Sequence, residues 1–243
     1  MVNQMQFSFM PDLLLTVYLL LIFPLQNVWR SRRSAPPKPS RPPLQSYWRQ
    51  GRFALVLLVA LALVMWLEKH SGSDLGLAFP RSPAAVWGLL AAGCLLLILH
   101  LAGKRTERRM TPEERTKAEA QVRDLPFVMP RTPLETAAYV LTMVCMTAAW
   151  EVLFRGYLLL VLTPITGLPA AVALAAIAYG AGHGYKNPKQ FFGSIAVAFS
   201  FTIGYALTGS LWWLIVLHAA APVTMLFAVR KIQTRSTVSE ASA

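Results

Sequence analysis

The chain alternates between long apolar segments and short charged connections. Most of the apolar segments approach the roughly 20 residues that a helix needs to cross a bilayer. They lie at about residues 7–25, 53–67, 84–102, 134–162, 169–184, 191–207 and 211–229. This pattern predicts an all-α fold, namely a polytopic helical membrane protein with about seven transmembrane helices.

Composition supports the membrane class. Hydrophobic residues make up 55% of the 243 residues and charged residues only 14%, whereas a soluble domain has about a quarter charged residues. The net charge of +12 does not indicate nucleic-acid binding, because the basic residues lie between the apolar segments and not on one face. We therefore expect the lipid bilayer as a partner and no nucleic acid. Cys94 and Cys145 lie in different apolar segments and form no disulfide or metal-binding pattern.

The distribution of lysine and arginine predicts the orientation of the chain. Connections 26–52, 103–133 and 185–190, together with the tail after residue 229, hold twenty of these residues, whereas connection 68–83 holds two. Loops rich in lysine and arginine stay in the cytoplasm. We therefore expect a multi-pass integral membrane protein with its N-terminus outside and its C-terminus in the cytoplasm.

The connections divide the chain into four regions. Residues 1–52 are predicted to form an N-terminal membrane anchor and a basic, proline-rich cytoplasmic linker. Residues 53–130 supply two membrane helices and a charged cytoplasmic loop. Residues 131–229 form the helical core that holds the candidate site, and residues 230–243 form a cytoplasmic tail.

One glutamate and one arginine lie inside the fourth apolar segment. Glu151 is the acidic residue deep within it, and Arg155 follows four residues later, so that both lie on one helix face and can pair. A charge at the bilayer centre costs about 2.5–3.5 kcal/mol on insertion scales, and such residues usually have a role. A salt bridge that only fixes helix packing is the structural alternative, although apolar replacements often stabilise as well as a buried ion pair.

Two histidines can complete a polar site with this pair. His183 lies between glycines near the end of the fifth segment, and His218 lies in the middle of the seventh. A glutamate can activate water, and a histidine can share or relay the proton. A proton-coupled carrier that uses the same residues as a relay is an alternative of a different class.

Other protease chemistries lack their residues. There is no H-E-x-x-H motif, no second intramembrane aspartate beside Asp12, and no G-x-S-x-G turn. These absences leave the glutamate–histidine site as the candidate for hydrolysis.

Three sequence blocks carry a resemblance to a known family. The blocks are EVLFRGYL (Glu151–Leu158), YGAGHG (Tyr179–Gly184) and TGSLWWLIVLHA (Thr208–Ala219), preceded by Pro133 and Glu135. In order and spacing they resemble the CAAX-protease and bacteriocin-processing family, also called the lysostaphin-resistance-like group, whose members are glutamate-dependent intramembrane endopeptidases. The resemblance implies that residues 131–229 are an intramembrane protease-like core, and that the chain lies in a bacterial cytoplasmic membrane.

The chain departs from the family pattern at two positions. The pattern places two adjacent glutamates before the arginine, and the first is assigned to the activation of water. Glu151 matches the second glutamate, and Trp150 stands where the first is expected. The pattern also has an asparagine or aspartate four residues after the last histidine, assigned with that histidine to oxyanion stabilisation, and here that residue is Pro222.

The resemblance implies an intramembrane peptidase, a hydrolase that cleaves a peptide bond in a membrane-associated protein or peptide. For such an enzyme Glu151 is expected to take over as general base despite its shift of one helical position, while His183 positions the water, His218 polarises the scissile carbonyl and Arg155 orients Glu151. No cofactor is expected, and a metal ion at the Glu/His site is left open. The alternative is a catalytically impaired relative that acts as a membrane binding, immunity or accessory protein.

Overall fold

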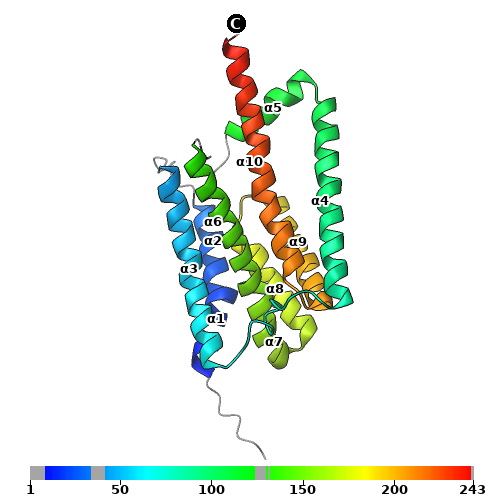
Figure 1. The fold of residues 1–243 in the computed structure, drawn as a ribbon. Helices are drawn as coiled ribbons and strands as arrows, with labels where there is room; N and C mark the ends of the chain where they lie inside the picture. Colours follow the sequence, from blue (N-terminus) through cyan, green and yellow to red (C-terminus); the bar gives the residue numbers. More distant parts are fainter. Residues whose placement is uncertain (1–8, 34–41, 124–129, 131, 242–243) are drawn as a thin grey trace, which may run out of the picture.

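The computed structural model describes residues 9–33, 42–123, 130 and 132–241, and within these ranges the regular structure is helical, with no strand. The elements are α1 (Phe9–Val17), η1 (Tyr18–Ile22), α2 (Phe23–Arg32), α3 (Pro43–Leu67), α4 (Pro83–Arg109), α5 (Pro112–Arg123), α6 (Pro133–Glu151), η2 (Val152–Tyr157), α7 (Leu158–Thr166), α8 (Leu168–Gly182), α9 (Pro188–Thr208) and α10 (Trp212–Ala241). The long helices run roughly side by side, and α5 lies near one end of them (Figure 1). The predicted all-α membrane fold is confirmed.

The membrane-spanning capacity of these helices agrees with the sequence pattern. Among the described residues, five continuous helices are long and apolar enough to cross a bilayer, and they cover residues 11–32, 43–67, 83–109, 133–166 and 188–208. Two shorter apolar helices, Leu168–Gly182 and Trp212–Phe227, coincide with the remaining predicted segments. The second predicted segment, 53–67, is the C-terminal part of α3, which begins at Pro43.

Two of the spanning helices contain a π-helical turn. The first span is α1, η1 and α2 in succession, and the fourth is α6, η2 and α7. A π turn adds a residue to the helical repeat and often occurs at functional sites. The second of these turns holds Arg155 and begins directly after Glu151.

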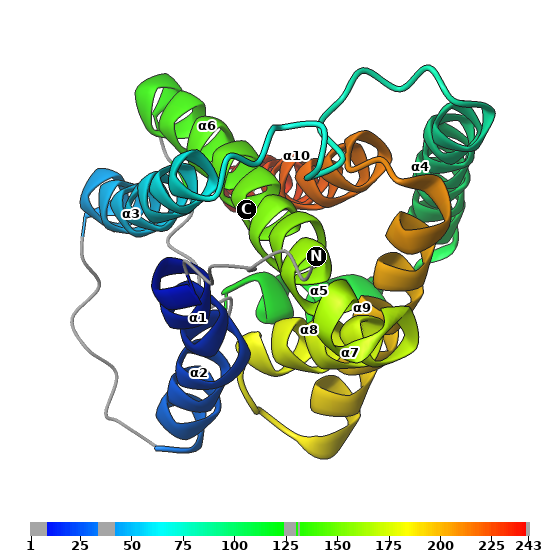
Figure 2. The ribbon, with the colours of Figure 1, turned by 90° about the horizontal axis from the view of Figure 1, so that it is seen from below.

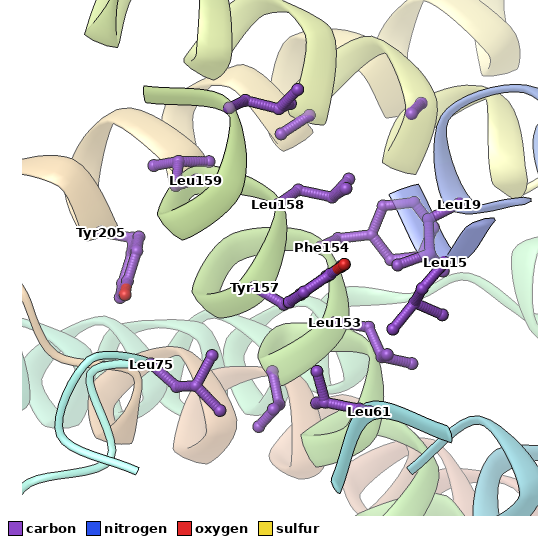
Figure 3. Packing of buried hydrophobic residues seen from close by; sticks show 14 of the residues in the cluster. Leu15, Leu19, Leu61, Leu75, Leu153, Phe154, Tyr157, Leu158, Leu159 and Tyr205 are labelled. Atoms are coloured by element: carbon purple, nitrogen blue, oxygen red, sulfur yellow. The ribbon is translucent and has the colours of Figure 1, made fainter. Parts of the chain in front are cut away.

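The helices pack around the segment formed by η2 and α7. Helix α8 lies against α9, α3 against α6, and α10 against both α6 and α4. Viewed from below, α4 lies at one edge beside α9 and α10, whereas α1 and α3 lie on the other side (Figure 2). The fully buried side chains of Leu153, Phe154, Tyr157 and Leu158 form the centre of this packing (Figure 3).

The N-terminal helix packs directly on this centre. Leu19 of η1 is fully buried and belongs to the same hydrophobic cluster as Phe154 and Leu158. The hydroxyl of Tyr157 lies 2.9 Å from Asp12 Oδ1 and 3.0 Å from the Asp12 carbonyl oxygen, both of which are acceptors. Helix α2 continues along α8, where a Cβ added to Gly182 would lie 2.8 Å from the ring of Phe23.

The connection between α3 and α4 is folded against the core and the start of α10. The backbone N–H of Leu211 donates to the Gly76 carbonyl at 3.0 Å, and the Trp212 indole N–H donates to the carbonyls of Leu77 and Ala78. Gly76 has φ +74°, a left-handed conformation that favours glycine. This connection therefore ties the start of α10 to the core.

Two glycines of the signature blocks permit close backbone approach. A Cβ on Gly156 would lie 2.9 Å from the carbonyl oxygen of Leu75, and a Cβ on Gly180 would lie 2.6 Å from Ile195 Cα. Real Cβ atoms do not approach that closely, so a larger residue would push the connection or α9 away. The glycines thus allow η2 and α8 to pack tightly on their neighbours.

Candidate active site

Glu151 is placed in the centre of the protein by the end of α6. Its side chain is fully buried, as is that of Arg155 in η2. Arg155 Nη1 donates to Glu151 Oε1 at 2.6 Å, so the i,i+4 pairing predicted from the sequence is formed. A guanidinium so close to a carboxylate compensates the burial of both charges.

His218 reaches the same carboxylate from α10. Its Nδ1 is hydrogen-bonded to Glu151 Oε1, the oxygen that also accepts from Arg155. The imidazole lies between two aromatic rings, with centroids 5.9 Å from the Tyr179 ring and 5.5 Å from the Phe201 ring. The structure therefore joins the fourth and seventh predicted segments through one carboxylate oxygen.

Tyr179 of α8 contacts every predicted member of the site except Glu151. Its hydroxyl lies 3.4 Å from His218 Nε2, and its ring lies 4.2 Å below the guanidinium carbon of Arg155. Its carbonyl oxygen lies 3.1 Å from His183 Nδ1. The sequence singled out Tyr179 only as the first residue of a signature block, because an aromatic residue in an apolar helix has no polar periodicity that marks it.

His183 lies at the edge of this cluster. It is the residue directly after α8, it is exposed, and its ring packs edge-on against Tyr179 at 4.9 Å between centroids. The hydrogen bonds recorded between described residues do not join His183 to Glu151 or His218. Of the predicted site residues, the structure thus brings Glu151, Arg155 and His218 into direct contact, and connects His183 to them through Tyr179.

Several buried polar atoms of the site have no hydrogen-bond partner within the described chain. They are Glu151 Oε2 and the Nε and Nη2 of Arg155. A buried polar atom without a partner is costly, and such atoms in a folded protein call for an explanation such as a water molecule or a catalytic role. The free lone pairs of Glu151 Oε2 suit the acceptance of a proton or a hydrogen bond from water.

Trp150 points its indole into an aromatic cluster. Its ring centroids lie 4.8 Å from Phe23, 5.7 Å from Phe154 and 6.2 Å from Phe53. The position where the family pattern has its first glutamate therefore packs α6 against α2 and α3.

Pro222 lies inside α10, which runs as one helix from Trp212 to Ala241. The carbonyl oxygen of Pro222 accepts from the Tyr139 hydroxyl at 3.4 Å. Proline has no side-chain donor and no N–H, so this position supplies an acceptor to α6 but no hydrogen bond to an oxyanion.

The geometry does not gather a metal-ligand set. Among the residues that the structure describes, no three His, Cys, Asp or Glu side chains lie close enough together to hold a metal ion. The site contains instead one carboxylate, one guanidinium and one imidazole in direct contact, with a phenol beside them. These groups can orient a water molecule and exchange a proton with it.

A comparison with protein families gives a match to the core region. Residues 132–224 match the family model described as type II CAAX prenyl endopeptidase Rce1-like. No curated protein and no solved structure gives a significant match. The matched region begins at the N-cap of α6 and contains Glu151, Arg155, Tyr179, His183 and His218. Residues 132–224 of this multi-pass helical membrane protein are therefore similar to the CAAX-protease-like family.

Proposed function

We propose that the protein is an intramembrane endopeptidase that hydrolyses a peptide bond in a membrane-associated protein or peptide. The observation that carries the proposal is that the two carboxylate oxygens of Glu151 have different surroundings. Arg155 and His218 both hold Oε1, whereas Oε2 is buried without a partner. A carboxylate fixed through one oxygen presents the other to a water molecule in a defined direction.

The proposed reaction uses this free oxygen as a general base. Glu151 Oε2 takes a proton from water while the water oxygen attacks the carbonyl carbon of the scissile bond. The tetrahedral intermediate then collapses, the C–N bond breaks, and Glu151 returns the proton to the leaving amine. Arg155 stabilises the carboxylate and fixes its orientation through the 2.6 Å hydrogen bond.

The histidines have different roles in this proposal. His218 orients Glu151, because its Nδ1 is engaged by the carboxylate. His183 helps to position the water, since a ring whose Nδ1 donates to the Tyr179 carbonyl leaves Nε2 as an acceptor. For His218 to polarise the carbonyl of the scissile bond, its ring would have to carry a proton on Nε2 as well as on Nδ1.

The orientation and substrate follow from charge and family. We propose a bacterial cytoplasmic membrane with the N-terminus outside, because the cationic ends of α2 and α4 and the C-terminal end of α10 all belong to the basic connections and tail. The ends of the described chain lie at opposite ends of the helices, which fits this orientation (Figure 1). The substrate class is a lipid-anchored or membrane-inserted polypeptide, including prenylated C-termini and bacteriocin leaders.

A second candidate function rests on Trp150 and Pro222. The aromatic packing of Trp150 replaces a carboxylate by a structural side chain, and Pro222 supplies no donor. A relative with these residues that binds membrane polypeptides without cutting them would act as an immunity or accessory protein.

The test compares cleavage of a fluorogenic membrane peptide by full-length protein in proteoliposomes. The variants are Glu151→Gln, His183→Ala and Trp150→Glu, with Glu113→Gln on the exposed surface of α5 as the matched control. The endopeptidase requires wild-type activity that falls at least a hundredfold in Glu151→Gln, since positioned acid–base groups contribute about 10²–10⁴-fold, and that the control retains. An inactive wild type together with activity in Trp150→Glu would reject it in favour of the binding relative.

A further inference from the structure

The hydroxyl of Tyr179 and the carboxylate of Glu151 lie at opposite nitrogens of the His218 ring. Together they determine which nitrogen of a neutral His218 carries the proton. His218 Nδ1 faces the carboxylate of Glu151, which as an anion has only acceptor atoms. Nδ1 must then carry the proton of a neutral imidazole. The opposite nitrogen, Nε2, has a lone pair and lies 3.4 Å from the Tyr179 hydroxyl, which has a proton to donate.

For a neutral imidazole beside an ionised Glu151, the hydrogen-bond chain has a single consistent direction. Tyr179 Oη donates to His218 Nε2, His218 Nδ1 donates to Glu151 Oε1, and Arg155 Nη1 donates to the same oxygen. The other neutral tautomer would place a lone pair on Nδ1 against the carboxylate, and like lone pairs repel. With this direction the buried Glu151 and Arg155 charges balance, and the imidazole adds none.

The ring of Tyr179 makes a second, separate contribution. Its face lies 4.2 Å from the Arg155 guanidinium carbon, a cation–π distance, and its edge packs at 4.9 Å from the His183 ring. These contacts need only the aromatic ring, so phenylalanine would retain them. The hydroxyl is the group that phenylalanine lacks, and it lies 3.4 Å from His218 Nε2.

We propose that Tyr179 is a positioning residue, whose hydroxyl donates to His218 Nε2 and, together with the Glu151 carboxylate at Nδ1, holds the Nδ1–H tautomer and leaves Glu151 Oε2 free. The proposal rests on the proposed function for its effect on rate, but the tautomer itself is a property of the resting protein. It exists whether or not the protein cleaves a peptide.

The chain offers a matched control in Tyr139. The hydroxyl of Tyr139 also lies 3.4 Å from an acceptor on α10, the carbonyl oxygen of Pro222. Tyr139→Phe and Tyr179→Phe thus remove the same group, at the same distance, from the same partner helix. Only the second change touches the ring of His218.

The first measurement is nitrogen NMR of full-length protein labelled with [¹⁵N]histidine in bicelles, with the His218 signals assigned by His218→Gln. We expect the wild type and Tyr139→Phe to show a protonated Nδ1 and an unprotonated Nε2. Tyr179→Phe should shift the Nε2 resonance toward that of an imidazole nitrogen that accepts no hydrogen bond, while Nδ1 keeps its proton. An unchanged His218 spectrum in Tyr179→Phe, or a protonated Nε2 in the wild type, would overturn the proposal.

The second measurement is peptidase activity of the same variants. We expect kcat of Tyr179→Phe to fall about tenfold with KM within about twofold, because the loss of one hydrogen bond is felt at the reacting carboxylate and not in substrate binding. Equal loss in Tyr139→Phe would indicate a general packing effect and contradict the assignment. If the wild type is inactive, the proposed function fails, and the NMR result alone decides the role of Tyr179.

Discussion

Glu151 and Arg155 stabilise one another in a place where either alone would be costly. Both side chains are fully buried, and their charges are 2.6 Å apart at the nearest atoms. Removing one partner of a buried pair leaves an uncompensated charge, whereas removing both can be nearly neutral. The energetic role of this pair can therefore be separated from its chemical role.

Replacement of Arg155 by methionine should strongly destabilise the protein. We expect Arg155→Met to lower the free energy of unfolding by about 3–5 kcal/mol, measured by thermal or denaturant unfolding in detergent micelles. The double variant Glu151→Leu with Arg155→Met should lose less, because no buried charge is left unpaired. A double variant that is less stable than Arg155→Met alone would show that the pair does not couple in this way.

At the scale of elements, the approach of α8 to α9 depends on a glycine. The Cβ that Gly180 lacks would lie 2.6 Å from Ile195 Cα, a backbone atom that cannot rotate away. Membrane helices associate by such close packing of small residues. The same helix carries Tyr179, so this contact also sets the depth at which the phenol enters the site.

Gly180→Ala should therefore destabilise, although alanine is a better helix former than glycine. We expect a loss of about 1–3 kcal/mol in the free energy of unfolding. Gly193→Ala in α9 is the control, because an added Cβ there meets nothing within 4 Å. Since alanine is the better helix former, this change should raise the free energy of unfolding by up to about 1 kcal/mol. Equal effects of the two changes would contradict the close approach of the helices.

The connection between α3 and α4 contains a turn that should respond to pH. The backbone N–H of Ser71 donates to Asp74 Oδ2 at 2.7 Å and its hydroxyl donates at 2.8 Å. These hydrogen bonds lower the pKa of Asp74 from its ordinary value of 3.8. A carboxyl with a lowered pKa in the folded protein stabilises the fold at pH values above its ordinary pKa, and this contribution is lost as the pH falls through the lowered value.

Hydrogen exchange of residues 71–78 provides the measurement. We expect slow exchange to persist down to about pH 4, after correction for intrinsic rates, and to weaken progressively below it. Asp74→Asn should exchange faster at neutral pH and lose this acid dependence. Identical pH profiles for the two proteins would show that the turn does not hold the connection.

At the scale of the whole molecule, the N-terminal helix belongs to the core. It packs against α8, and its Leu19 is fully buried, whereas Leu21 on the same turn is 56% exposed. The hydrogen bonds from Tyr157 to Asp12 connect this helix to the signature block that also carries Arg155. The segment that holds Arg155 thus contacts the N-terminal helix, and the candidate site also contains His218 of α10.

Leu19→Ala should reduce the stability of the whole domain. Removal of a fully buried leucine side chain typically costs about 2–5 kcal/mol. Leu21→Ala, two residues away on the exposed side, should change stability by no more than about 0.5 kcal/mol. Both are measured by thermal unfolding in detergent, and similar small effects would mean that the helix is only a peripheral anchor.

The sequence alone determined the class of the molecule and one contact of its site. Continuous apolar segments can bury backbone groups in lipid only as helices, so the pattern specified the helical membrane fold. The i,i+4 spacing of Glu151 and Arg155 specified their pairing, because that spacing is local to one helix. The three signature blocks predicted the resemblance to the CAAX-protease-like family, whose model matches residues 132–224.

The tertiary structure decided which distant groups meet. The contact of His218 with Glu151, the hydroxyl of Tyr179 between the helices, and the aromatic packing of Trp150 depend on how α6, α8 and α10 are rotated and set in depth. The π turn at Val152–Tyr157 changes that rotation inside a helix whose sequence shows no interruption. Hydropathy records which residues avoid water, but in a membrane helix apolar on every side it does not record which face meets which neighbour, and that choice is made by packing.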